Sequence, residues 1–275
     1  MPNQYRPRHR ATLAISLVCI VLPLHVAQAD DPLQGSSGSF SWLDGASQQA
    51  AEWNVILGGG FRVEPEFEGA NDYKIMPVPF VSADFGPYVS VGPMGLTINA
   101  WDYEGMSVKG RLGYDLGRDS SDDKHLHGLG DIGAGAVLGL DLAYNLDPVE
   151  FKVSLDKTVG GSDGFAAKFG TAYSFGVDSF MFSIGPSVTW SDGNYMESYF
   201  GVTDRQSEKS GLSSFDADAG FKRLDLEVSG LYFIDEHWVV RGEAGLGYLV
   251  GDAADSPVSQ ENLQMSTMFL LGYKF

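Results

Sequence analysis

Cysteine is almost absent from this chain of 275 residues. The single cysteine, Cys19, lies in an apolar run near the N-terminus. A framework of disulfide bonds is therefore excluded, and so is thiol chemistry if that run is removed during export.

Basic residues are also scarce. The chain has 18 Lys and Arg residues against 36 Asp and Glu residues, which gives a net charge of −18. Removing residues 1–29 would take away three arginines and no acid, leaving 15 basic residues against 36 acidic ones. Because such a surface repels phosphate groups, no nucleic-acid partner is predicted.

Apolar runs are short. Three arginines between residues 6 and 10 precede the longest run, residues 11–24, and Ala27-Gln28-Ala29 has the small-x-small form of a signal-peptidase site. The run is shorter than the roughly 20 residues that a spanning helix needs, which disfavours a retained anchor. The bulky Val18 before Cys19 disfavours a lipoprotein. We therefore predict a cleaved signal peptide over residues 1–29.

From residue 53 onward, the sequence contains a series of segments in which apolar and polar residues alternate. Residues 149–159 place four valines or leucines and Phe151 on one face and mostly polar side chains on the other. The last nine residues place Phe269, Leu271, Tyr273 and Phe275 on one face. Alternation alone fits a soluble sandwich as well as a membrane barrel. Several strands reach ten residues, and Trp and Tyr residues gather near strand ends, which favours the barrel.

Short and long connections alternate along the chain. Turns are expected near residues 85–87, 102–105, 146–148, 177–178 and 235–236. Longer loops are expected at residues 62–72, 117–128, 160–164, 191–218 and 251–264, with residues 195–202 as structured loop. This pattern predicts an all-β, transmembrane, antiparallel up-and-down β-barrel of about 12 strands, closed by the C-terminal strand. The expected domains are a signal peptide (1–29), a periplasmic N-terminal tail (30–52) and an outer-membrane barrel (53–275).

The polar face of the strands carries charges of both signs, which predicts a network of ion pairs in the barrel lumen. This network would either fill a narrow lumen or select small polar solutes. Its expected members are Lys109, Arg111, Asp115, Asp141, Glu150, Lys152, Asp156, Lys168, Arg223, Asp225, Glu227, Arg241 and Glu243.

Several ordered motifs lie within about residues 53–275. They include Glu68-Gly69-Ala70-Asn71-Asp72-Tyr73, Gly185-Pro186-Ser187-Val188-Thr189-Trp190 and, most specifically, Gly251-Asp252-Ala253-Ala254-Asp255-Ser256-Pro257. Together these motifs resemble the MipA/OmpV family. The sequence departs from the family at Ala70, where serine is usual. The terminal Tyr273 and Phe275 resemble the signature by which the barrel assembly machinery recognises outer-membrane proteins.

The resemblance implies a protein of the cell outer membrane, in contact with its lipid and lipopolysaccharide. It also implies a scaffold that links a lytic murein transglycosylase to a murein synthase. A narrow pore for small polar or cationic solutes and a surface-exposed antigen or adhesin-like barrel remain as alternatives.

Catalysis, a cofactor and a bound metal are not predicted. His125 and His127 lie beside two aspartates, but two imidazoles without visible support are a weak metal signal. The acidic residues at positions 64, 66, 68 and 72 are expected to be solvated loop carboxylates or a contact for divalent cations.

Overall fold

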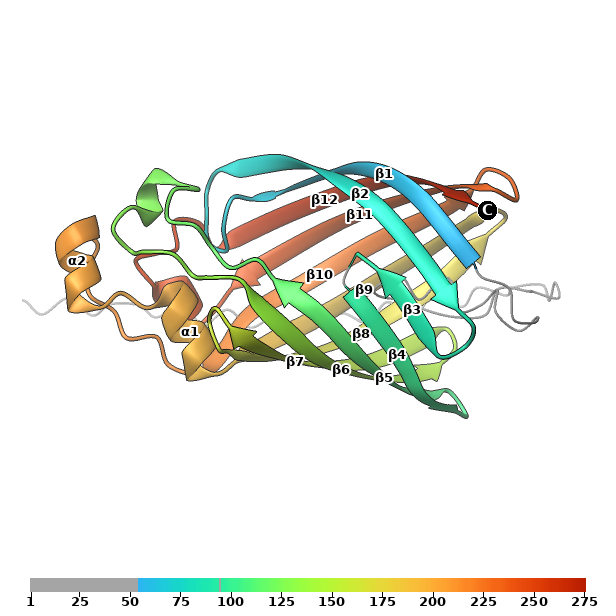
Figure 1. Ribbon diagram of the computed structural model, residues 1–275, viewed down its shortest axis with the longest axis horizontal. Coiled ribbons are helices and arrows are strands. Elements are labelled where there is room, and N and C mark those ends of the chain that lie inside the picture. The colour runs from blue at the N-terminus through green and yellow to red at the C-terminus, as the bar shows by residue number, and fades with distance from the viewer. Residues whose placement is uncertain (1–53, 94) are drawn as a thin grey trace, which may run out of the picture. The chain divides into compact units, whose positions relative to one another are not determined.

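The computed structural model describes residues 54–93 and 95–275. The predicted signal peptide, the predicted tail and Trp53 lie outside these residues. The described chain forms twelve antiparallel strands that close into one barrel (Figure 1). Each strand pairs with its neighbours in sequence, and the last strand pairs with the first over eight residue pairs. The prediction of a twelve-stranded barrel closed by the C-terminal strand is confirmed.

The strands are β1 (Asn54–Pro65), β2 (Tyr73–Phe85), β3 (Val89–Gly92), β4 (Gly95–Tyr103), β5 (Met106–Asp115), β6 (Gly135–Leu146), β7 (Val149–Gly160), β8 (Phe165–Val177), β9 (Phe180–Ser191), β10 (Gly220–Phe233), β11 (Trp238–Leu249) and β12 (Leu263–Lys274). Between them lie the 3-10 helix η2 (Lys124–Leu126) and the helices α1 (Gly193–Phe200), α2 (Asp204–Ser210) and α3 (Asp252–Asp255). Within the described ranges, no helix is long and apolar enough to cross a membrane.

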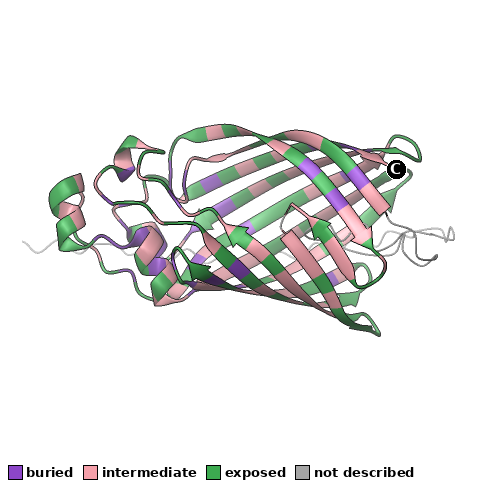
Figure 2. Cartoon of the chain, viewed as in Figure 1, coloured by how far each residue is buried: buried purple, intermediate pink, exposed green. Residues whose placement is uncertain are grey.

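Exposure alternates along the strands, as Figure 2 shows by its banding. The outward side chains are large and apolar, as expected where a strand meets lipid and not a second sheet. Examples with more than a third of their surface exposed are Leu57, Phe61, Ile75, Val81, Leu138, Leu140, Leu142, Phe151, Phe169, Leu224, Leu226, Val228, Leu246, Phe269 and Leu271.

Aromatic side chains gather at the end of the barrel that carries the short turns. Phe180 stacks on Tyr232 with ring centroids 4.3 Å apart, and Trp238 meets Tyr273 edge-on at 5.0 Å. Such amphipathic rings suit the boundary between lipid and water.

Glycines allow the closing strands to approach each other. A Cβ atom at Gly60 would overlap the carbonyl oxygen of Phe269, and one at Gly58 would overlap that of Leu271. At the intervening Gly59, the nearest atom would be Val78 O at an ordinary 3.6 Å. The close contact between β1 and β12 therefore requires that Gly58 and Gly60 have no side chain.

The loops at the other end differ in part from expectation. β1 extends to Pro65, so the first loop is shorter than the predicted 62–72. The prediction of a structured loop at 195–202 is confirmed, and most of it is the helix α1.

Candidate functional site: a capped lumen

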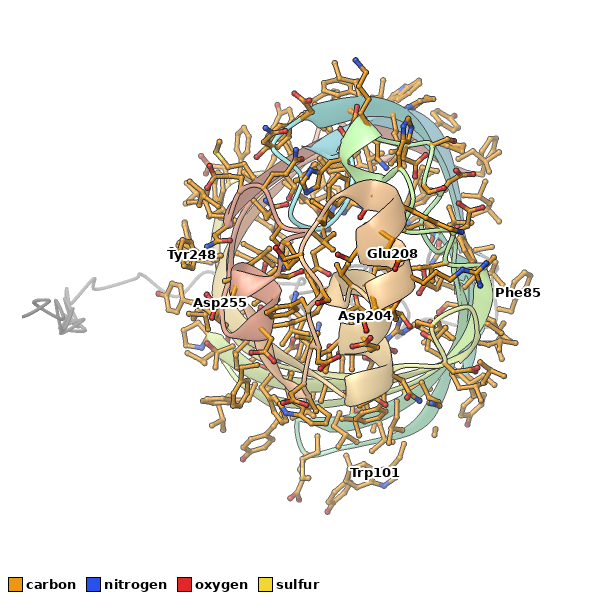
Figure 3. The ribbon with its side chains drawn as sticks, turned by 90° about the vertical axis from the view of Figure 1, so that its left-hand side faces the viewer. Phe85, Trp101, Asp204, Glu208, Tyr248 and Asp255 are labelled. Carbon is orange, nitrogen blue, oxygen red and sulfur yellow. The ribbon has the colours of Figure 1, made fainter. Side chains whose placement is uncertain are left out.

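Four loops fold together into a cap over the end of the barrel opposite the short turns. They are the loops that follow β1, β5, β9 and β11, and Figure 3 looks down on them from that end, with α1, α2 and α3 lying across the barrel. Local signals fix the helices. Asp192 accepts a hydrogen bond from Tyr195 N at 2.9 Å at the start of α1, and Thr203 and Gln206 form a capping box at the start of α2.

The cap has two small apolar cores of its own. The first contains Phe67, Ala70, Leu126, Leu129, Val202 and Val258. The second contains Met196, Phe200, Ala217, Leu249 and Ala253. Both cores join loops that are far apart in the sequence, so the loops support one another and are not independent solvated segments.

A buried ion pair ties the cap to the barrel wall. Lys222 Nζ of β10 lies 2.7 Å from both carboxylate oxygens of Glu68 in the first loop, and Arg223 lies 3.5 Å from the same carboxylate. The Tyr195 hydroxyl of α1 donates to Glu68 at 3.1 Å, and Lys222 Nζ lies 4.3 Å from the Tyr195 ring centroid. The carboxylate, the ammonium and the phenol thus satisfy one another away from water.

This arrangement corrects the expectation of a solvated carboxylate at Glu68, whereas Asp72 is exposed as expected. Only 14% of the Glu68 side chain is exposed in the ion pair, and Glu64 lies on β1 with Arg62 3.5 Å away. The backbone carbonyl of Glu66 accepts a hydrogen bond from Lys74 at 2.9 Å. The first loop is therefore held by cations of the protein itself.

The pairing of β9 with β10 explains why two adjacent cations reach one carboxylate. Its register shifts between Phe221 and Arg223, which inserts one extra residue into β10. In a regular strand, neighbours point to opposite faces, whereas at this bulge Lys222 and Arg223 both approach Glu68.

Burial and charge act in opposite directions on Glu68. Burial alone would raise the pKa of this carboxyl, but Lys222 and Arg223 outweigh it and hold the pKa below its ordinary value of 4.5. A group with a lowered folded-state pKa stabilises the fold above its ordinary pKa, and this contribution is lost as the pH falls through the folded value.

We therefore expect the cap to stay closed at about pH 5 to 7, because this range lies above the ordinary pKa of a carboxyl group. The cap should loosen only at more acidic pH. Pepsin cleavage of the cap at a series of acidic pH values measures this. A Glu68→Gln variant provides the control, because its cleavage should lack the acid-dependent step. Loosening that begins above the ordinary pKa of 4.5 would contradict the assignment.

The lumen below the cap is charged along one side. Arg111 lies 2.7 Å from Asp156 and 3.3 Å from Asp141, and it bridges three strands. The other ion pairs are Lys168 with Glu227 at 2.9 Å, Arg223 with Asp225 at 2.7 Å, Lys152 with Glu150 at 3.3 Å, and Arg241 with Glu243. Lys109 faces Asp141 in the register of β5 and β6. Asp115 lies higher, where it accepts a hydrogen bond from the Tyr199 hydroxyl at 3.0 Å.

The opposite side of the lumen is apolar, which sequence reasoning missed. Ile56, Phe80 and Leu270 are buried against one another, and Val78 and Met268 pack against them. These residues come from β1, β2 and β12, so the charged lining predicted for the lumen is confined to other strands.

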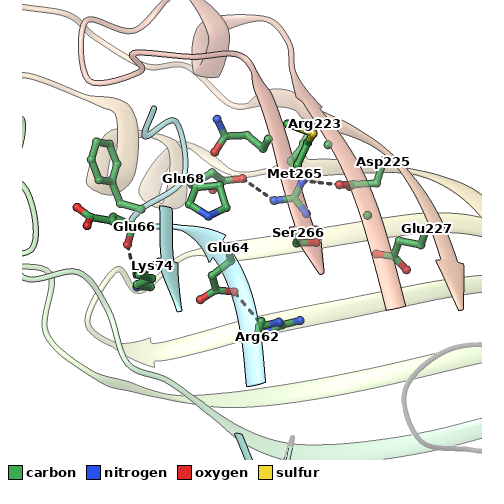
Figure 4. Close-up of a pocket in the computed structure, with 15 residues that line it drawn as sticks. Arg62, Glu64, Glu66, Glu68, Lys74, Arg223, Asp225, Glu227, Met265 and Ser266 are labelled. Carbon is green, nitrogen blue, oxygen red and sulfur yellow. Dashed lines mark hydrogen bonds and ion pairs between the residues drawn. The ribbon is translucent and has the colours of Figure 1, made fainter. Parts of the chain in front are cut away.

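A cavity of about 360 Å³ lies between the cap and the lumen (Figure 4). Its lining includes Arg62, Lys74 and Arg223 together with five acidic side chains, those of Glu64, Glu66, Glu68, Asp225 and Glu227. Among the described residues, no group of three or more His, Cys, Asp or Glu side chains has a geometry that could hold a metal ion. His125 contacts Pro257 O at 2.9 Å and joins two loops of the cap.

Comparison with known proteins decides the family. The sequence model of the family described as "MltA-interacting protein MipA" matches residues 57–275. This chain belongs to the MipA family. The resemblance drawn from its motifs is confirmed, and the protein is an outer-membrane β-barrel.

Curated relatives extend over nearly the whole barrel. The MltA-interacting protein of Escherichia coli (strain K12) is 25% identical over 229 residues, which cover 82% of this chain and 92% of the relative. YiaT of the same strain, whose name refers to the outer membrane, is 22% identical over 234 residues, covering 84% and 94%. An outer membrane channel from Pseudomonas putida F1 is 10% identical, with a TM-score of 0.43 and coverage of 88% and 100%.

The motif that carried the MipA resemblance, residues 251–257, builds part of the cap. It contains α3, with Ala253 buried in the second apolar core. Ser256 Oγ donates to Phe200 O of α1 at 2.5 Å and accepts from Val258 N at 3.1 Å. Asp252 accepts from Asp218 N at 2.8 Å. These contacts give the family motif a structural role in this chain.

The C-terminal aromatics of this MipA-family barrel lie at the end with the short turns. Tyr273 packs against Trp238 and Phe275, each with ring centroids 5.0 Å apart, and Phe275 N donates to Val55 O at 3.0 Å. Their recognition by the assembly machinery stays a prediction.

Proposed function

We propose that this protein docks a lytic murein transglycosylase, and through it a murein synthase, at the periplasmic end of the barrel, and that it catalyses no reaction itself. The observation that carries the proposal is the asymmetry of the two ends. A cap with two apolar cores covers the outer end, whereas the other end consists of short hairpin turns. The MltA-interacting name of the Escherichia coli relative supports this choice of partner.

The exposed charge at the periplasmic end is mainly acidic. Four successive hairpin turns, those that follow β4, β6, β8 and β10, each carry one or two exposed acids: Glu104, Asp147, Asp178, Asp235 and Glu236. The exposed Asp102 lies near the end of β4, beside the first of these turns. A ring of like charge attracts a cationic surface and speeds its association. We therefore expect the docked enzyme to present basic side chains.

Capture of MltA by the purified barrel in detergent tests the proposal. The four substitutions Asp102→Asn, Glu104→Asn, Asp178→Asn and Glu236→Gln should reduce capture several-fold, and salt should weaken capture by the wild type. Asparagine suits positions 104 and 178 because both residues have a positive φ, 49° and 52°, which asparagine tolerates.

The control removes three negative charges at the other end, by Asp204→Asn, Glu208→Gln and Asp216→Asn, and should leave capture unchanged. A third variant lacks residues 30–52, the predicted periplasmic tail, and separates docking on the turns from docking on the tail. Failure of the wild-type barrel to retain MltA would refute the proposal. Steady currents in planar bilayers, in the presence of the intact cap, would favour a solute pore instead.

A further inference from the structure

The barrel wall is incomplete on one side of β2. β2 pairs with β1 through twelve residue pairs, from Tyr73 to Asp84, but its ladder with β3 has only three pairs and ends at Ala83. β3 has four residues and pairs with the outer end of β4. Within residues 54–93 and 95–275, no other strand continues this side of β2 toward Tyr73. Figure 1 shows β2 diverging from β3 and β4 toward the capped end.

The ladder stops where β3 ends at Gly92, and two prolines lie in the part of β2 beyond it. Pro77 and Pro79 are two residues apart, so their nitrogen atoms face the same edge of β2. The ladder with β1 runs past both, opposite Phe61 and Gly59, without a shift of register. Because proline cannot donate to a ladder, these nitrogens face the edge that β3 leaves uncovered.

The same prolines restrict what can lie against this edge. A strand added from another chain would need donors that Pro77 and Pro79 lack, so strand addition is disfavoured. A hydrocarbon chain makes no hydrogen bonds, so it satisfies none of the amide groups at a strand edge, and each unsatisfied amide is costly in lipid. Because Pro77 and Pro79 have no N–H group, fewer donors remain unsatisfied at this edge than at an ordinary one. The edge is therefore adapted to contact hydrocarbon.

The surfaces on both sides of the interruption are apolar. On the outside, Ile75 and Val81 expose 74% and 51% of their surface toward the membrane. On the inside, Met76, Val78 and Met268 are partly exposed above the buried Ile56–Phe80–Leu270 cluster. Lipid-facing and lumen-facing apolar surfaces thus meet at one place in the wall, and flexible methionines can adapt to a chain of irregular shape.

We propose that the interruption beside β2 admits the hydrocarbon chain of an outer-leaflet amphiphile into the barrel, where the chain rests on Met76, Val78 and Met268. The charged cavity lined by Lys74 and Met265 lies next to this surface and can accommodate a polar headgroup. The site lies in the outer half of β2, away from the periplasmic turns, so it is independent of the docking function proposed above.

Contact quenching by lipids with brominated acyl chains tests the proposal in vesicles. Single cysteines labelled with bimane are placed, in a full-length Cys19→Ser background, at Val78 and Met268 on the lumen side of the apolar region. Ile75 on the lipid side is the positive control. Ser154 is the negative control, because it faces the lumen between Asp141 and Lys168 on the charged side.

The Val78 and Met268 probes should lose emission as the Ile75 probe does, whereas the Ser154 probe should keep it. Adding Val78→Asp to the Met268 probe should restore its emission, while Val78→Leu should leave the quenching in place. Equal, negligible quenching of the probes at positions 78, 268 and 154 would overturn the proposal. This comparison does not use the Val78→Asp variant, so it decides the question even if that variant fails to fold.

Discussion

Replacing Lys222 with methionine is expected to open the cap while the barrel stays folded. Glu68 would remain buried after losing its nearest cation, and an uncompensated buried charge costs on the order of 3–5 kcal/mol. Arg223, at 3.5 Å, would compensate only in part. Limited digestion by proteinase K in detergent, followed by mass spectrometry, should show cleavage in residues 192–219 that the wild type resists. The heat-dependent electrophoretic shift of the barrel should persist.

The double variant Glu68→Gln/Lys222→Met separates charge from packing. Removing both charges together leaves two neutral side chains of similar size, so digestion should return toward the wild-type rate. If Lys222→Met alone is cleaved as slowly as the wild type, the ion pair does not hold the cap.

Replacing Gly60 with alanine is expected to prevent closure of the barrel. The new Cβ atom would overlap Phe269 O, a backbone atom in a strand that pairs on both sides and cannot move away. Overpacking of this kind costs about 1–3 kcal/mol, and valine should cost more than alanine. The fraction of protein with the electrophoretic mobility of the folded barrel should fall accordingly.

Gly59→Ala is the matched control, since its Cβ would meet Val78 O at 3.6 Å and needs no rearrangement. It makes the same chemical change one residue away. Similar folded fractions for Gly59→Ala and Gly60→Ala would show that the two strands do not need this close approach.

The barrel was predictable because the side-chain period of a strand is two, and lipid requires apolar residues at every outward position. The turns were predictable for a similar reason, since each contains Gly, Pro or Asp between alternating segments. Arg111, Asp141 and Asp156 lie on the lumen face of three consecutive strands, so these residues could be named from alternation before their partners were known.

The cap was not predicted, because its stability comes from contacts between distant loops. One local signal was available: Tyr195, Met196, Tyr199 and Phe200 recur with the spacing of a helix, after an aspartate suited to cap it. The role of Lys222 could not be found by alternation, because the bulge in β10 inserts one residue and changes the face to which it points.

The first apolar core of the cap has a consequence for the order of assembly. Phe67 follows the first strand and Val258 precedes the last, so all the strands from β2 to β11 separate two side chains in the same cluster. Contacts between such remote positions form late, because the intervening chain must first be ordered. Protection of this cluster from solvent exchange therefore reports that insertion into the membrane has been completed.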